Sequence, residues 1–162
     1  MITLKEQLLM LNLKQFYSDK INISIILPVL EGKTPISLRS LDWFVTNYSK
    51  NNNIIFNRNN TFYNVWLDYK SQLKAFSKKN FDPFCRRERI VFEFLPKKYL
   101  TTTVGQLNFF KWAIENNILE YVSENIKLIE KDMNIVNNKN ALNITTNKKL
   151  NKNKIDIIIS FN

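Results

Sequence analysis

Apolar side chains recur every three or four residues in four stretches of the chain, and this spacing predicts four amphipathic helices. In chain order, the four stretches cover residues 3–17, 37–50, 61–79 and 101–133. Thr3 and Ser37 precede the first two stretches and carry side chains of the kind that N-caps require. In the first helix Leu4, Leu8 and Leu11 share one face, which we expect to pack inward.

The third predicted helix has the most regular pattern of the four. Its apolar stripe repeats at alternating steps of four and three, through Phe62, Trp66, Tyr69, Leu73 and Phe76. On one flank of the stripe, lysines recur at steps of four, at Lys70, Lys74 and Lys78. We therefore expect a helix that packs through its aromatic side chains and presents a ridge of lysines beside them.

The stretches between the helices predict strands and turns. Residues 21–30 are rich in β-branched side chains, and we expect a short strand or an extended arm there. Further short strands are predicted at residues 54–56 and 89–95. The Phe-Asp-Pro-Phe corner at residues 81–84 ends the third helix, because proline disfavours helix at its own position and at the preceding residue. Two asparagines at 116–117 predict a kink or a short turn in the fourth helix.

We expect the whole chain to adopt an α+β fold, as a mostly helical single domain with a few short strands. Residues 1–133 form the predicted globular domain. Residues 134–154 are rich in asparagine and lysine with little periodicity, so we expect a flexible segment there. Residues 155–162 predict a C-terminal strand.

Charge is concentrated in the middle of the chain. Of its 162 residues, 24 are basic and 14 acidic, for a net charge of +10. Residues 47–111 hold 12 basic and 4 acidic groups, a net of +8, whereas residues 112–134 hold 2 and 5, a net of −3. The A/T-rich codons of asparagine, lysine and isoleucine are an alternative explanation of the lysine count. The placement of the arginines is therefore the stronger signal for an anionic partner.

Several chemistries are excluded by composition. The chain has no histidine, which removes Ser-His-Asp and Cys-His nucleophiles and histidine-based zinc sites. Its single cysteine, Cys85, excludes an intrachain disulfide, and we interpret it as an inert core residue. Two glycines cannot build a glycine-rich phosphate loop. We expect no catalytic residues, no cofactor and no bound metal.

No export signal is visible, and no apolar run approaches the length of about 18 residues that a membrane span needs. We therefore expect a soluble protein without a membrane partner.

The basic middle segment is our candidate for a nucleic-acid site. Arginine makes bidentate contacts to phosphate, and an exposed phenylalanine can stack on a base. The candidate residues are Lys70, Lys74, Lys78, Lys79, Arg86, Arg87, Arg89, Phe81 and Phe84. Two other interpretations stay open. In the first, the phenylalanines belong to the core and the cations form a solvated face. In the second, the arginines pair with acidic side chains of this chain or of a partner protein.

Two weaker patterns point to other classes of protein. Asp42, Asp68 and Lys70 have the residue types of a magnesium-dependent nuclease, although a chance match is the simpler explanation. The fourth helix, interrupted at 116–117, has the outline of a helix-turn-helix. Its surface is acidic and would repel DNA, so we interpret this helix as core and scaffold.

Three segments together resemble a family of proteins encoded by giant nucleocytoplasmic large DNA viruses. They are SLRSLDWFVTNYSK (37–50), DYKSQLKAFSKKNFDPFCRRERI (68–90) and TTVGQLNFFKWAIENNILEYV (102–122). The resemblance implies a viral protein in the host cytoplasm, at the viral factory, or in the virion. It assigns no activity and no catalytic residue.

These observations lead to two functional hypotheses. The first is a non-enzymatic viral protein that binds DNA or RNA in packaging, genome condensation or late gene expression. The second is a minor capsid or scaffold protein of the virion whose basic face docks an acidic viral protein.

Overall fold

The computed structural model describes residues 2–85 and 88–161, with side chains described up to residue 143. The chain divides into two compact units, residues 1–126 and 127–162. The predicted α+β class is confirmed, with helices dominating and two small antiparallel sheets among the described residues. The elements are α1 (Leu4–Tyr17), α2 (Lys20–Leu30), α3 (Leu38–Trp43), the π-helix η1 (Phe44–Tyr48), α4 (Ser49–Asn51), β1 (Ile55–Arg58), β2 (Thr61–Asn64), α5 (Val65–Phe76), α6 (Lys78–Phe81), β3 (Arg89–Leu95), β4 (Lys98–Thr103), α7 (Val104–Glu115) and α8 (Ile118–Phe161).

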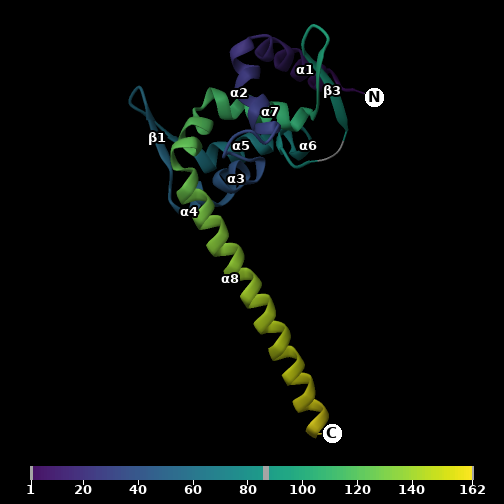
Figure 1. Ribbon diagram of the computed structural model, residues 1–162, viewed down its shortest axis with the longest axis vertical. Helices are drawn as coiled ribbons and strands as arrows, with labels where there is room; N and C mark the ends of the chain where they lie inside the picture. The colour runs from purple at the N-terminus through teal and green to yellow at the C-terminus, as the bar shows by residue number, and fades with distance from the viewer. Residues whose placement is uncertain (1, 86–87, 162) are drawn as a thin grey trace. The chain divides into compact units, whose positions relative to one another are not determined.

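Helix α7 is the centre of the first unit. It contacts α1, α2, α6 and β4, and its label lies among those of the other helices in Figure 1. Thr103 caps its N-terminus by accepting a hydrogen bond from the backbone N–H of Gln106. The buried side chains of α7 include Leu107, Phe109 and Phe110, as a core helix requires. The interpretation of this helix as core is confirmed.

Helix α1 packs with the face opposite to the one that the sequence suggested. Its start is as predicted, because Thr3 and Glu6 form a capping box in which the side chain of each accepts from the backbone N–H of the other. The buried side chains, however, are Leu9, Leu13 and Tyr17. The exposed ones are Leu4, Leu8 and Leu11. The helix has two apolar faces, and the Tyr17 hydroxyl, which donates to the carbonyl of Leu107 over 2.6 Å, ties one of them to α7.

The prediction of a strand or an extended arm at residues 21–30 is wrong, since these residues form α2. The Asp19 side chain caps the helix by accepting from the backbone N–H of Ile21 over 2.9 Å. The β-branched residues Ile23, Ile26 and Val29 then follow steps of three and bury one helical face. Packing on that face outweighs their preference for strands.

A hairpin replaces the predicted first turn of the third helix. Asn59 and Asn60 both have positive φ, 48° and 65°, which suits the two-residue turn between β1 and β2. Phe62 therefore lies on a strand and is 77% exposed. Helix α5 begins at Val65, with Asn64 as its cap. The helical spacing that included Phe62 was accidental.

A second hairpin joins β3 to β4 in antiparallel register. The predicted strand at 89–95 is confirmed as β3. The sequence missed β4, which follows a two-residue turn at Pro96 and Lys97, the latter with φ of 63°. The backbone N–H of Lys97 donates to the Glu93 carboxylate over 3.1 Å and holds this turn.

Helix α8 continues through the residues for which a flexible segment and a strand were predicted. Its backbone is helical to Phe161, apart from Asn125, whose φ of −116° lies outside the helical range. The expected strand at 155–162 is therefore wrong for the described residues. Residues 106–162 contain neither glycine nor proline, so no helix breaker ends α8 early. Among the described residues, none of the helices combines the length and apolar character needed to cross a membrane.

Candidate nucleic-acid interface

Two of the predicted cations, Lys70 and Lys74, lie one turn apart on the exposed side of α5. The Lys70 ammonium is 5.9 Å from the centroid of the Trp66 ring, and the ammonium of Lys50 approaches the same ring at 4.9 Å. Such cation–π contacts hold both ammonium groups near one indole. The structure thus adds Lys50 to the cationic surface of α5, although it lies 20 positions from Lys70 in the chain. No local pattern in the sequence indicates this contact.

The predicted ridge of lysines does not continue past α5. Ser77, with φ of 73°, separates α5 from α6, so Lys78 does not follow Lys74 along one helix. Lys78 is exposed, and it has no ion pair within the described part of the chain.

Lys79, in contrast, has two acidic partners of its own chain. Its ammonium lies 3.2 Å from the Glu6 carboxylate and 3.2 Å from that of Glu88. These two hydrogen-bonded carboxylates raise the pKa of Lys79. The assignment of Lys79 to a free cationic face is corrected, because its charge is already balanced.

Phe81 is also corrected. Its side chain is fully buried, and its ring lies 5.7 to 6.0 Å from four other aromatic rings. These rings belong to Tyr69, Phe76, Phe109 and Trp112. A ring that anchors the contact between α5, α6 and α7 cannot stack on a base.

Phe84 and Arg89 meet at a small cavity of about 240 Å³. Phe84 is 42% exposed, and its backbone N–H donates to the Asp82 carboxylate over 2.8 Å, which turns the chain after α6. Arg89 is the exposed first residue of β3. The rest of the lining includes Cys85, which is half-buried with a free thiol, together with Leu38, Pro83, Gln106 and the threonines at 101–103. A cavity lined by an exposed ring, an arginine and hydroxyl groups has the side-chain types that contact a nucleotide.

Arg86 and Arg87 lie outside the described residues. By sequence they connect Cys85 and Glu88, two described residues that line different cavities.

The carboxylates considered for a nuclease have other surroundings. Asp68 accepts hydrogen bonds of 2.6 Å from the Tyr63 hydroxyl and the Trp112 indole N–H, so it joins β2, α5 and α7. Burial and the nearby Asp82 carboxylate raise the pKa of Asp42 to about 6. Within residues 2–85 and the described residues after 87, no group of three or more acidic or cysteine side chains is arranged to hold a metal ion.

Comparison with known sequences identifies the family. The chain belongs to a family of unknown function, DUF7197, which matches residues 2–159. It is similar to an uncharacterized protein of Acanthamoeba polyphaga mimivirus, with 41% identity over 144 residues that cover 83% of this chain and 55% of that relative. The expected membership of a giant-virus family is confirmed. The chain spans about half the length of this relative. No solved structure matches the chain significantly.

Proposed function

We propose that this protein binds nucleic acid without catalysing a reaction, in packaging, genome condensation or late gene expression of a giant virus. The observation that carries the proposal is a set of exposed cations without acidic partners in the described part of the chain. The set is Lys70, Lys74, Lys78 and Arg89. Each of these groups is free to contact a phosphate oxygen, and such contacts supply most of the affinity of sequence-independent binding.

The surroundings of Phe84 and Arg89 support a flexible, single-stranded partner in particular. A guanidinium next to a partly exposed aromatic ring can hold a phosphate while the ring stacks on the adjoining base. Arg86 and Arg87, which lie outside the described residues, fall between Phe84 and Arg89 in the sequence. The Asp68 carboxylate, engaged by Tyr63 and Trp112, supports a binding protein rather than a nuclease. The place of action would be the viral factory in the host cytoplasm, or the virion.

The test replaces Lys70, Lys74 and Arg89 together by alanine and measures binding to random-sequence single- and double-stranded oligonucleotides. All three side chains are exposed, so the fold should persist. We expect the affinity at low salt to fall by about tenfold to a hundredfold. The matched control replaces Lys20, Lys33 and Lys127 by alanine. These lysines are exposed in other parts of the chain, and their replacement lowers the net charge by the same amount. Equal losses in both variants would show that only overall charge matters and would contradict this interface.

The second candidate is a minor capsid or scaffold protein whose same cations dock an acidic viral protein. Exposed leucines on α1 favour this assignment, because apolar surface of this kind commonly serves assembly. The ratio of this protein to capsid protein in purified particles separates the candidates. A fixed ratio supports the structural protein, whereas release together with the genome supports nucleic-acid binding.

A further inference from the structure

Helix α1 carries an exposed apolar face that nothing in the first unit covers among the described residues. Leu4, Leu8 and Leu11 are 71%, 53% and 61% exposed, and their spacing places them on one side of the helix. We name these three residues the outer leucine face. Single exposed leucines are ordinary, but three adjoining ones form a contiguous apolar patch. By helical geometry Lys5 and Lys14 flank the patch on either side, so its border is basic.

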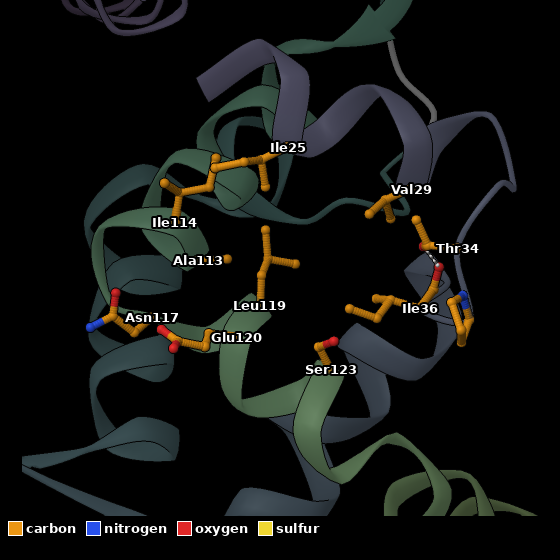
Figure 2. A pocket seen from close by; sticks show the side chains of 11 residues that line it. Ile25, Val29, Thr34, Ile36, Ala113, Ile114, Asn117, Leu119, Glu120 and Ser123 are labelled. Atoms are coloured by element: carbon orange, nitrogen blue, oxygen red, sulfur yellow. Dashed lines mark hydrogen bonds between the residues drawn. The ribbon is translucent and has the colours of Figure 1, made fainter. Parts of the chain in front are cut away.

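The same unit contains an apolar groove that an exposed helix face can fill. The groove has a volume of about 480 Å³, and its apolar lining consists of Ile25, Val29, Ile36, Ala113, Ile114 and Leu119. Figure 2 shows Ile25 and Ile114 on one side, Val29 and Ile36 on the other, and Leu119 pointing between them. At Ala113 the groove stays open because the alanine side chain is too small to fill it.

The charges at the groove are opposite to those at the outer leucine face. Glu120 lines the groove, and Glu124 follows one turn later on α8. Both side chains are exposed, and neither forms an ion pair with a described residue. Lys14 beside the leucines is likewise exposed and without an ion pair in the described part of the chain. The two surfaces of this molecule are therefore both apolar and have borders of opposite charge.

We propose that the protein forms a twofold dimer in which the outer leucine face of each copy occupies the apolar groove of the other. A second copy is the occupant that the chain itself supplies, with leucines for the hollow and Lys14 for the acidic border, since the Lys5 ammonium donates to the Ala75 carbonyl of its own chain over 2.9 Å. In a twofold dimer the same contact occurs twice, so the buried area doubles. Stable interfaces typically bury about 1,200–2,000 Å² in total. The dimer is independent of the proposed binding of nucleic acid and forms without it.

The experiment measures self-association of the full chain by sedimentation equilibrium over a range of concentrations, without nucleic acid. The first variant changes Leu4, Leu8 and Leu11 to glutamine, and the second changes Ile25 and Ile114 to glutamine. Each variant is expected to raise the dimer dissociation constant by about tenfold to a hundredfold or more, since each leucine or isoleucine loses its burial. Leu67→Gln with Val91→Gln is the matched control, because both residues are exposed on other elements. This control should dimerise as the unchanged chain does.

Mixing the two variants tests the pairing directly. The first variant retains an intact groove and the second an intact leucine face, so a mixed dimer keeps one of its two contacts whole, and the mixture should associate more tightly than either variant alone. A mixture that associates no more tightly than either variant alone, or a groove variant that dimerises normally, would overturn the proposal. An unchanged chain that is monomeric at every concentration would overturn it as well. Binding of that monomer to anionic vesicles through α1 would then assign the leucines to a membrane surface.

Discussion

Ser77 separates the cations of α5 from those of α6, and its backbone conformation is one that glycine adopts far more easily than serine. Its φ of 73° and ψ of 161° fall in a region where a side chain costs about 1–3 kcal/mol. The conformation is held by neighbouring helices, since the backbone N–H of Ser77 donates to Leu73 and its carbonyl accepts from Asn80. The backbone conformation of Ser77 therefore changes the direction of the chain, so that Lys78 and Lys79 lie on a separate helix, α6.

Ser77→Gly should relieve this strain and stabilise the protein by about 1 kcal/mol, after the added entropy of the unfolded chain is subtracted. The free energy of unfolding in urea measures the effect. Ser77→Val is the matched opposite, and it should destabilise because a β-branched side chain fits this conformation poorly. Equal stabilities for glycine, serine and valine at this position would show that the backbone is not strained.

Asp42 is a half-buried carboxylate whose charged form the fold disfavours. Burial and the Asp82 carboxylate raise its pKa to about 6 from an ordinary 3.8. The folded state thus binds a proton more tightly than the unfolded state does. The resulting stabilisation is fully present below about pH 3.8 and is lost as the pH rises through 6.

Asp42→Asn should stabilise the protein at pH 7, on the order of 1 kcal/mol after allowance for solvent screening of this half-buried group. The advantage over the unchanged protein should shrink as the pH falls from 7 to 4. Thermal unfolding of both proteins across that pH range measures the difference in their stability. The contributions of the other titrating groups are the same in both proteins and cancel in this difference. A difference that is constant with pH would contradict the raised pKa of Asp42.

At the scale of elements, the close packing of α6 on α7 positions the turn that carries Phe84. Gly105 makes this packing possible, because a Cβ atom there would lie 2.7 Å from the Asp82 carbonyl oxygen and 3.0 Å from that of Lys79. Both atoms are backbone and cannot turn away. Any side chain at 105 must push the two helices apart.

Gly105→Ala is therefore expected to destabilise the protein by about 1–3 kcal/mol, as overpacking in a core does. The shift of the Asp82 turn should also weaken nucleic-acid binding by displacing Phe84. Urea unfolding and oligonucleotide binding give the two measurements. Ser71→Ala, at an exposed position of α5, is the control and should change stability by less than about 0.5 kcal/mol. An alanine at 105 without effect on stability would argue against the close approach.

The sequence predicted those elements whose signals are local. Capping residues identified the starts of α1 and α3. The Phe-Asp-Pro-Phe corner was predicted to end the third helix, but α5 ends earlier, at Phe76, and the corner begins at the end of the short helix α6. The inward face of α1 was not predictable, because Leu4, Leu8 and Leu11 and the buried Leu9 and Leu13 satisfy the same helical spacing. Only the docking of α1 on α7 distinguishes between them.

The candidate site was also predicted only in part, because local features of the sequence indicate exposure but not long-range packing. The exposure of Lys70, Lys74 and Lys78 follows from their polar character. The burial of Phe81 and the exposure of Phe84 depend on how α6 packs. The residues adjacent to them in the sequence do not determine this packing. The pairing of Lys79 with Glu6 joins residues 73 positions apart. Long-range contacts of this kind are invisible to a local pattern.

At the scale of the whole molecule, the chain is strongly basic, and its acidic residues are densest at 112–134, after the segment that carries the candidate cations. The net charge is +10, while the segment at 112–134 is acidic. Among the cations assigned to the interface and described in the structure, Lys79 alone is paired with carboxylates. A polyanion would be attracted over distances of about a Debye length and then held by direct phosphate contacts.

The salt dependence of oligonucleotide binding tests this account most directly. Filter binding of a random-sequence oligonucleotide to the unchanged protein should show the logarithm of the association constant falling linearly with the logarithm of salt concentration. Four phosphate contacts, from Lys70, Lys74, Lys78 and Arg89, predict a slope of about −3 to −4. Absence of binding at low salt, or an affinity that does not change with salt, would contradict the claim that these cations form a nucleic-acid interface.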